Sequence, residues 1–121
     1  MRDGQGLLVL KDGSNYAGAF IQDKKCGYGK HIYEDGSTYE GWWVNDLFNG
    51  QGKSEDLDGQ VYEGEWKEGK KNGMGELWNS DGTRFKGSFL DDQYNGFGVQ
   101  VYPNGIVFAG EWEQGKVKKR L

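Results

Sequence analysis

Cysteine, proline and long apolar runs are scarce in this chain of 121 residues. The single cysteine, Cys26, cannot form an internal disulfide, and its isolation favours a reducing compartment. The longest apolar run covers only Leu7 to Leu10, which is too short for a membrane-spanning helix or for the core of a signal peptide. We therefore expect a soluble, cytoplasmic protein.

Excess positive charge is also missing. The net charge of −4 argues against a nucleic-acid-binding protein, which needs a basic face to neutralise phosphates. The only histidine, His31, has no second histidine or cysteine at ligand spacing, so we expect neither a metal nor a cofactor. Gly50 to Ser54 end like a phosphate-binding loop, but Leu47 stands where that motif requires glycine. No pair of acids is singled out for acid–base chemistry, and we expect no enzyme.

Glycine and aromatic residues are abundant and regularly spaced, with 22 glycines and 15% aromatics. They fall into columns that repeat every 23 residues without insertion, which indicates a repeat array. The columns are a first aromatic (Tyr16, Tyr39, Tyr62, Phe85, Phe108), a glycine two residues later, a second aromatic (Phe20, Trp43, Trp66, Phe89, Trp112), a glycine pair (Gly27/Gly29, Gly50/Gly52, Gly73/Gly75, Gly96/Gly98, preceded by Gly4/Gly6) and an Asp-Gly or Asn-Gly turn.

Alternation with period two within each unit predicts a β-hairpin, since nothing recurs at helical spacing. Pro103 decides the turn: a two-residue turn at Asn104-Gly105 would place proline where an N–H should bond across the strands. We therefore predict a type I turn with Gly105 in the left-handed conformation, so that Tyr102 faces Ile106. This register gives plausible cross-strand pairs, which are Leu7/Ala17, Lys30/Glu40, Lys53/Glu63, Glu76/Lys86 and Val99/Ala109.

The same register places Trp43, Trp66, Phe89 and Trp112 opposite Gly27, Gly50, Gly73 and Gly96, so that a ring can lie over bare glycine backbone. We predict an all-β fold: a single-layer, elongated, twisted antiparallel sheet of about ten strands. The chain is one array over residues 1–121, with hairpins at about 4–21, 27–44, 50–67, 73–90 and 96–113 and a basic tail at 114–121. One face should be a solvent-facing aromatic trough and the other should be charged.

The run from Tyr62 through Gly64, Trp66 and Gly69 to Gly75 resembles the MORN (membrane occupation and recognition nexus) repeat. The resemblance covers nearly the whole chain; residues 46–48 and 92–94 depart from the usual form, which residues 69–71 show. It implies hairpins stacked into an elongated sheet and a non-catalytic module that holds protein partners. It also implies a cytoskeletal, ciliary or membrane-associated setting.

Three sets of residues are candidate contact sites. The expected protein-binding groove comprises His31, Tyr39, Trp43, Tyr62, Trp66, Phe85 and Phe89. A second contact is expected at Leu47, Phe48 and Tyr94, which we interpret as apolar loop residues. The apolar N-terminal edge strand, with Leu7, Leu8, Val9 and Leu10, is a candidate for self-association because unpaired edges recruit further strands.

Two alternative functions remain open at this point. The array could be a structural element that self-assembles as a dimer or end to end, or an adaptor for anionic phospholipids. The basic groups that favour the lipid hypothesis are Lys67, Lys70 and Lys71 on one hairpin and Lys116, Lys118, Lys119 and Arg120 at the C-terminus.

Overall fold

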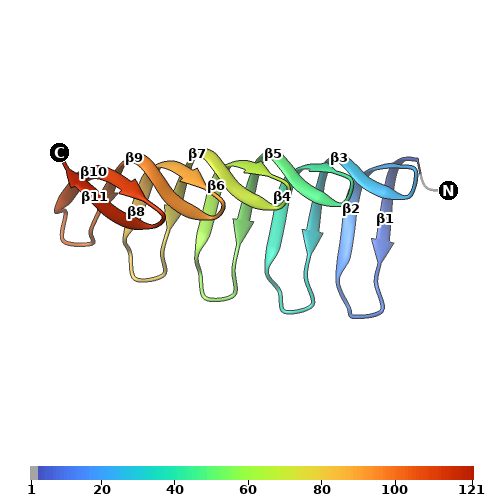
Figure 1. The fold of residues 1–121 in the computed structure, drawn as a ribbon. Helices are drawn as coiled ribbons and strands as arrows, with labels where there is room; N and C mark the ends of the chain where they lie inside the picture. Colours follow the sequence, from blue (N-terminus) through green and yellow to red (C-terminus); the bar gives the residue numbers. More distant parts are fainter. Residues whose placement is uncertain (1–2) are drawn as a thin grey trace.

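The computed structural model describes residues 3–121, which form one sheet of eleven antiparallel strands in chain order (Figure 1). The predicted all-β, single-layer fold is confirmed. The strands are β1 (Gly4–Val9), β2 (Asn15–Ile21), β3 (Lys24–Ile32), β4 (Thr38–Val44), β5 (Leu47–Glu55), β6 (Val61–Lys67), β7 (Lys70–Trp78), β8 (Arg84–Leu90), β9 (Gln93–Val101), β10 (Val107–Glu113) and β11 (Lys116–Arg120).

The sheet has one strand more than the sequence indicated, because the basic residues at the C-terminus are not a tail. Lys116–Arg120 pair with β10 as the edge strand β11, and every residue of this strand is exposed. The basic side chains of β11 do not prevent its pairing with β10, because on an outer edge they remain in water.

Two kinds of turn alternate along the chain, and the first is the predicted three-residue loop. The Tyr102 N–H donates to the Ile106 carbonyl (2.9 Å), the Gly105 N–H donates to the Tyr102 carbonyl (2.9 Å), and Gly105 has a φ of 87°. These loops lie at the lower ends of the hairpins in Figure 1. The predicted register follows from them, and all five predicted cross-strand pairs are confirmed.

The second kind of turn was not predicted. It has two residues, both with positive φ, as at Asn45-Asp46 (48° and 69°) and Glu68-Gly69 (49° and 83°). This is the type I′ conformation, whose twist matches that of the flanking strands. It follows the second aromatic residue within each 23-residue unit and lies in the upper part of the molecule in Figure 1.

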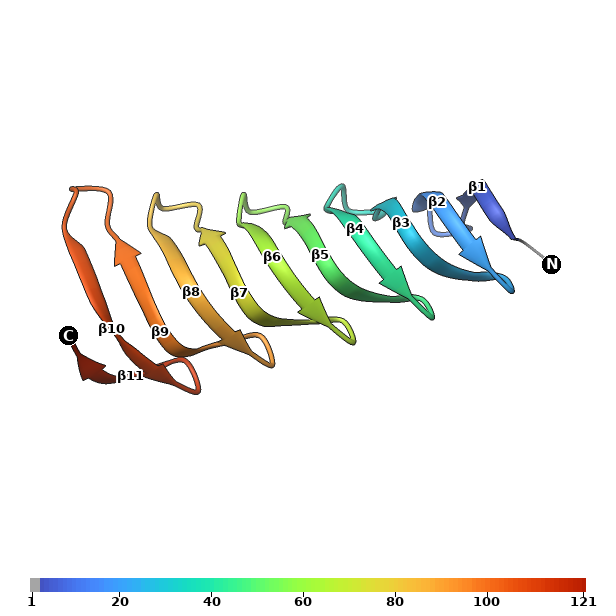
Figure 2. The same ribbon diagram turned by 90° about the horizontal axis from the view of Figure 1, so that it is seen from above.

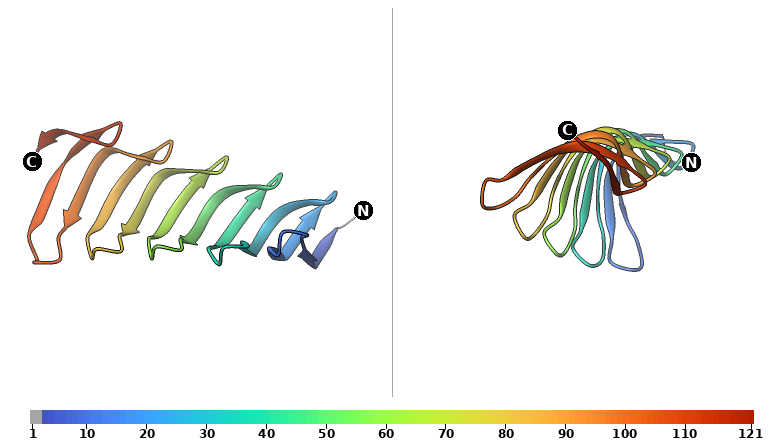
Figure 3. Two further views of the ribbon diagram at one scale, coloured as in Figure 1. Left: turned by 90° about the horizontal axis from the view of Figure 1, so that it is seen from below. Right: turned by 60° about the vertical axis from the view of Figure 1, so that its left-hand side comes forward.

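A bulge bends each repeat just after this second turn. The pairing of β2 with β3 passes from Gly18↔Gly29 to Phe20↔Lys25, so β3 has more residues there than β2. Gly27 lies in this surplus and has a φ of 104°. The later repeats show the same shift, and the upper parts of the hairpins curl over one face of the sheet (Figures 2 and 3).

This curl encloses a core, so the prediction of a solvent-facing aromatic trough is wrong. Tyr39, Tyr62 and Phe85 are 0–1% exposed, and Trp43, Trp66 and Phe89 are 2–7% exposed. The rings form a continuous ladder in which each first aromatic meets the second aromatic of its own repeat and of the next one edge to face. The contacts Tyr39–Trp43, Tyr39–Trp66, Tyr62–Trp66 and Tyr62–Phe89 have centroid distances of 5.0–5.4 Å.

The rings that cover glycine belong to the first aromatic column. Trp43 does lie opposite Gly27 in the register, but the backbone of Gly27 turns its Cβ position toward Ala19 on the other face. The Tyr39 ring instead lies on Gly52, where any Cβ would collide with its hydroxyl. Tyr16, Tyr62 and Phe85 cover Gly29, Gly75 and Gly98 in the same way.

Candidate functional site

One side chain per repeat closes the core above each first aromatic ring. These residues, Lys25, Phe48, Lys71 and Tyr94, are called the lid residues below. Phe48 stacks on Tyr39 with centroids 3.7 Å apart, and Tyr94 stacks on Phe85 at 3.8 Å. Lys25 places its Nζ 5.6 Å from the centre of the Tyr16 ring, and Lys71 places its Nζ 5.4 Å from that of Tyr62. Aromatic and cationic lids therefore alternate.

The lid position corrects the interpretation of Leu47, Phe48 and Tyr94 as exposed loop residues. The type I′ turn ends at Asp46, so Leu47 already begins β5, and Tyr94 lies in β9. Phe48 and Tyr94 are half-buried parts of the core, whereas Leu47 remains 48% exposed.

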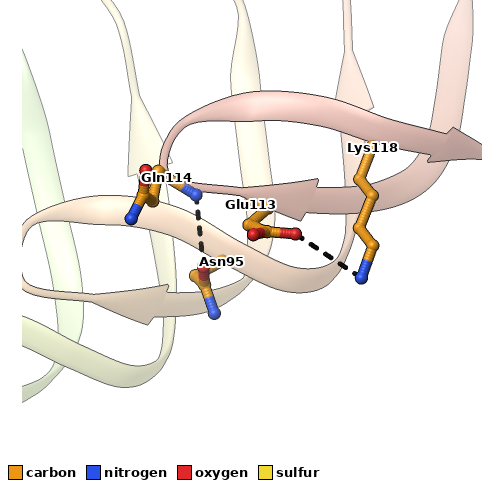
Figure 4. A network of polar contacts seen from close by, with 4 residues as sticks. All are labelled: Asn95, Glu113, Gln114 and Lys118. Carbon is orange, nitrogen blue, oxygen red and sulfur yellow. Dashed lines mark hydrogen bonds and ion pairs between the residues drawn. The ribbon is translucent and has the colours of Figure 1, made fainter.

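The turn tips are tied to the strands of the preceding repeat. The Asp46 N–H donates to the Lys25 carbonyl (3.0 Å), and the Lys25 N–H donates to Asp46 Oδ1 (2.8 Å). Asp92 and Lys71 repeat both bonds. At two other tips an asparagine accepts instead: the Glu68 N–H donates to Asn49 Oδ1, and Figure 4 shows the Gln114 N–H donating to Asn95 Oδ1, both at 3.2 Å. These bonds hold the turn tips in a row. The row is called the rim below, and the groove is the surface that runs along it between the lid residues.

Two cavities open between the lids on this rim, with volumes of about 300 and 270 Å³. Seven residues of the first cavity have counterparts 46 residues later in the second. The matched pairs are Lys25/Lys71, His31/Leu77, Trp43/Phe89, Asp46/Asp92, Leu47/Gln93, Phe48/Tyr94 and Gly69/Gly115. The array therefore presents the same site twice, once every two repeats.

The two cavities differ chemically at His31. Its ring is 4% exposed and stacks on Tyr33 with centroids 4.3 Å apart, while Nδ1 has no hydrogen-bond partner among residues 3–121. Burial lowers the pKa of His31, and the nearby Lys25 cation lowers it further, against a small opposing effect of Asp12. Burial therefore favours the neutral form of His31, whose Nδ1 is itself buried, whereas the second cavity has the apolar Leu77 at this position.

The structure brings most of the sequence-predicted groove residues together, but as the floor of the groove. Tyr39, Trp43, Tyr62, Trp66, Phe85 and Phe89 lie beneath the lids, and only His31, Trp43 and Phe89 among the seven line a cavity. Lys25, Lys71, Asp46 and Asp92 line the cavities and were missed. The sequence did contain a signal for this site. Residues 46–48 and 92–94 depart from the usual repeat, and these two stretches are 46 residues apart, as are the matched residues of the two cavities.

The remaining candidates lie elsewhere. Leu7, Leu8 and Val9 are on β1, and Leu10 starts the following loop. Of the basic groups, Lys71 covers the Tyr62 ring, and Lys118 pairs with Glu113 at 3.5 Å (Figure 4).

Within residues 3–121 no cluster of histidine, cysteine or acidic side chains is arranged to hold a metal ion, and no helix could cross a membrane.

Comparison with known families gives one match, to the MORN repeat, in four consecutive copies at residues 16–38, 39–61, 62–84 and 85–107. A comparison with curated proteins gave no match. The four copies cover most of the chain and coincide with the 23-residue unit of first aromatic, bulge, type I′ turn and lid. The protein belongs to the MORN repeat family.

Proposed function

We propose that this protein is a non-catalytic scaffold that holds a segment of a protein partner along the groove between its lid residues. The membership of a repeat family typical of binding scaffolds supports the general role. The same resemblance supports a cytoplasmic setting in a cytoskeletal, ciliary or membrane-associated assembly, which stays a proposal.

The observation that carries this function is the pair of matched cavities. They are four strands apart, which corresponds to roughly 19 Å at about 4.8 Å per strand. A segment that fills both must place two anchors at that spacing, about six residues apart if extended or about thirteen if helical. A partner reaching both sites gains affinity over one that reaches a single site, because the second contact is intramolecular.

The two cavities share a lysine and an aspartate, which are Lys25 and Asp46 in the first and Lys71 and Asp92 in the second. The first has Leu47 where the second has Gln93, so the second cavity offers one more polar side chain to an anchor. Tyr39, Tyr62 and Phe85 cannot make the contact themselves because they are only 0–1% exposed. A substitution in the floor, such as Tyr62→Ser, would damage the core, because the Tyr62 side chain is only 1% exposed.

Site-specific photo-crosslinking in cells tests the proposal. A photoreactive amino acid replaces exposed Leu47 in one variant and exposed Gln93 in another, and Met74 on the opposite face serves as the control position. We expect positions 47 and 93 to label the same segment of one protein, and position 74 to label a different set. Labelling of unrelated proteins at positions 47 and 93 would contradict binding along the groove.

A synthetic peptide of the labelled segment then allows a quantitative test. Leu47→Glu and Gln93→Glu should each weaken binding of the peptide by about tenfold, since each removes one of two anchors. Met74→Glu, at a side chain that is 57% exposed, should leave the affinity unchanged. Equal effects of all three variants in calorimetry would reject the groove as the binding site.

A further inference from the structure

The two edges of the sheet differ in a way that selects one partner. At the N-terminal edge, β1 has no charged residue, and its Leu7 and Val9 side chains are both 68% exposed. At the other edge, four of the five residues of β11 are lysine or arginine. An uncharged, apolar edge is the kind that accepts a further strand, whereas basic side chains oppose one.

The backbone of β1 is half used. Because the Leu10 N–H donates to the Ser14 carbonyl (2.8 Å), the alternation of an antiparallel ladder directs the N–H and C=O groups of Leu8, Gly6 and Gly4 toward β2. The same groups of Val9, Leu7 and Gln5 therefore point away from the sheet. The residues with free backbone groups are also those whose side chains lie on the exposed face opposite the aromatic core.

Strand polarity limits what can join this edge. In an antiparallel sheet ordered β1 to β11, the two edge strands run in the same direction. Antiparallel pairing of β1 with β11 of another copy would thus require that copy to be turned over, with its core side on the opposite face. Pairing of β1 with β1 needs only a two-fold rotation about an axis normal to the sheet, which keeps both core faces on one side.

We propose that the chain forms a two-fold symmetric dimer through β1, with Leu7 of one copy opposite Leu7 of the other. Gln5 then lies opposite Val9, and each of these pairs exchanges the two hydrogen bonds of a bonded antiparallel pair. The Leu7 and Val9 side chains cover one another across the axis. Because this rotation reverses the strand direction, the edges that carry the lid residues point opposite ways in the two copies, and this dimer is additional to the partner binding proposed above.

The same symmetry at β11 would be unfavourable. It would bring Lys116, Lys119 and Arg120 of two copies side by side, and like charges in adjacent strands repel. The β1 contact itself is small. A six-residue strand buries less surface than the roughly 1,600 Å² of a standard interface, so the dimer should dissociate at low concentration.

Sedimentation equilibrium of the full chain over a range of concentrations tests the proposal. Leu7→Pro removes an N–H that points away from β2, so it should leave the fold intact and raise the dimer Kd by about tenfold or more. Arg120→Pro is the matched control on the opposite edge, because Arg120 faces Gly110 at a position whose backbone groups also point outward. Val9→Lys should act like Leu7→Pro, and Val107→Lys, at a side chain that is 59% exposed, should not.

The register has its own test. With Cys26→Ser to remove the native thiol, Leu7→Cys should form a disulfide-linked dimer, because symmetry-related Cα atoms in a bonded pair are about 5.5 Å apart. Val9→Cys should not, since its neighbour across the axis is Gln5. A strict monomer at high concentration would overturn the proposal. A dimer that Leu7→Pro leaves unchanged, or that Arg120→Pro disrupts, would also overturn it.

Discussion

Single atoms decide whether a glycine position tolerates a side chain in this protein. Gly6, Gly29, Gly52, Gly75 and Gly98 occupy one column of the repeat. At Gly52 a Cβ would collide with the Tyr39 hydroxyl, and the ring is fixed there because that hydroxyl donates to the Trp42 carbonyl (3.1 Å). At Gly6, in the edge strand, the nearest atom to a Cβ is in the Phe20 ring at 3.4 Å, an ordinary contact.

We therefore predict that Gly52→Ala destabilises the protein by about 2–4 kcal/mol, because the added methyl displaces a buried ring. The matched change Gly6→Ala should alter the stability by less than about 0.5 kcal/mol, since the site has room and does not require a positive φ. Urea titrations followed by tryptophan fluorescence compare the two variants. Similar losses of stability in both variants would show that glycine is needed in this column for its backbone conformation and not to make room for the ring.

At the scale of the hairpin, the bulge and the type I′ turn together convert an open sheet face into a closed core. They carry the strand after the turn back over the ring of its own repeat, where the lid residue lies. Both kinds of lid fit this place. An aromatic lid stacks on the first aromatic ring, and a lysine lid places its cation over the face of that ring.

Phe48→Lys should lower the stability by about 1–3 kcal/mol, because it replaces a stacked ring with a cation–π contact and loses apolar burial. The neighbouring change Leu47→Lys should stay within about 0.5 kcal/mol, since that side chain is 48% exposed. Thermal unfolding by circular dichroism measures both. Equal stability of the two variants would mean that Phe48 does not close the core.

The whole molecule is a linear array of hairpins (Figure 3). Each hairpin packs on its neighbours along one ladder of rings. Its two ends therefore have fewer stabilising contacts than its middle. The edge strands show this directly, because every residue of β11 is exposed and only Leu8 of β1 packs on the core.

Hydrogen exchange should consequently be fastest in β1 and β11 and slowest in β5 to β7, where both neighbouring repeats are present. Mass spectrometry of peptic fragments, at a concentration low enough to keep the chain monomeric, measures this gradient. Uniform protection from β1 to β11 would indicate that the array opens only as a single cooperative unit. At high concentration, added protection confined to β1 would agree with the proposed dimer.

The repeat pattern by itself determined the fold class, the hairpins, the three-residue loop at Pro103 and the strand register across the loops of that kind. These follow from local rules, since the turn geometry and the period-two alternation act over a few residues. The pattern also placed the rings on one face. It was wrong about their exposure, because burial depends on the curl that bulges such as the one at Gly27 impose on the strands.

Only the tertiary structure decided which residues form the groove. Lys25 and Asp46 are 21 residues apart and meet because a turn tip docks on the preceding repeat. Phe48 became a core residue for the same reason, although its sequence context resembled a loop. The identity of β11 as a strand also required the neighbouring β10, since a run of basic residues forms a strand only where an edge is available to pair with it.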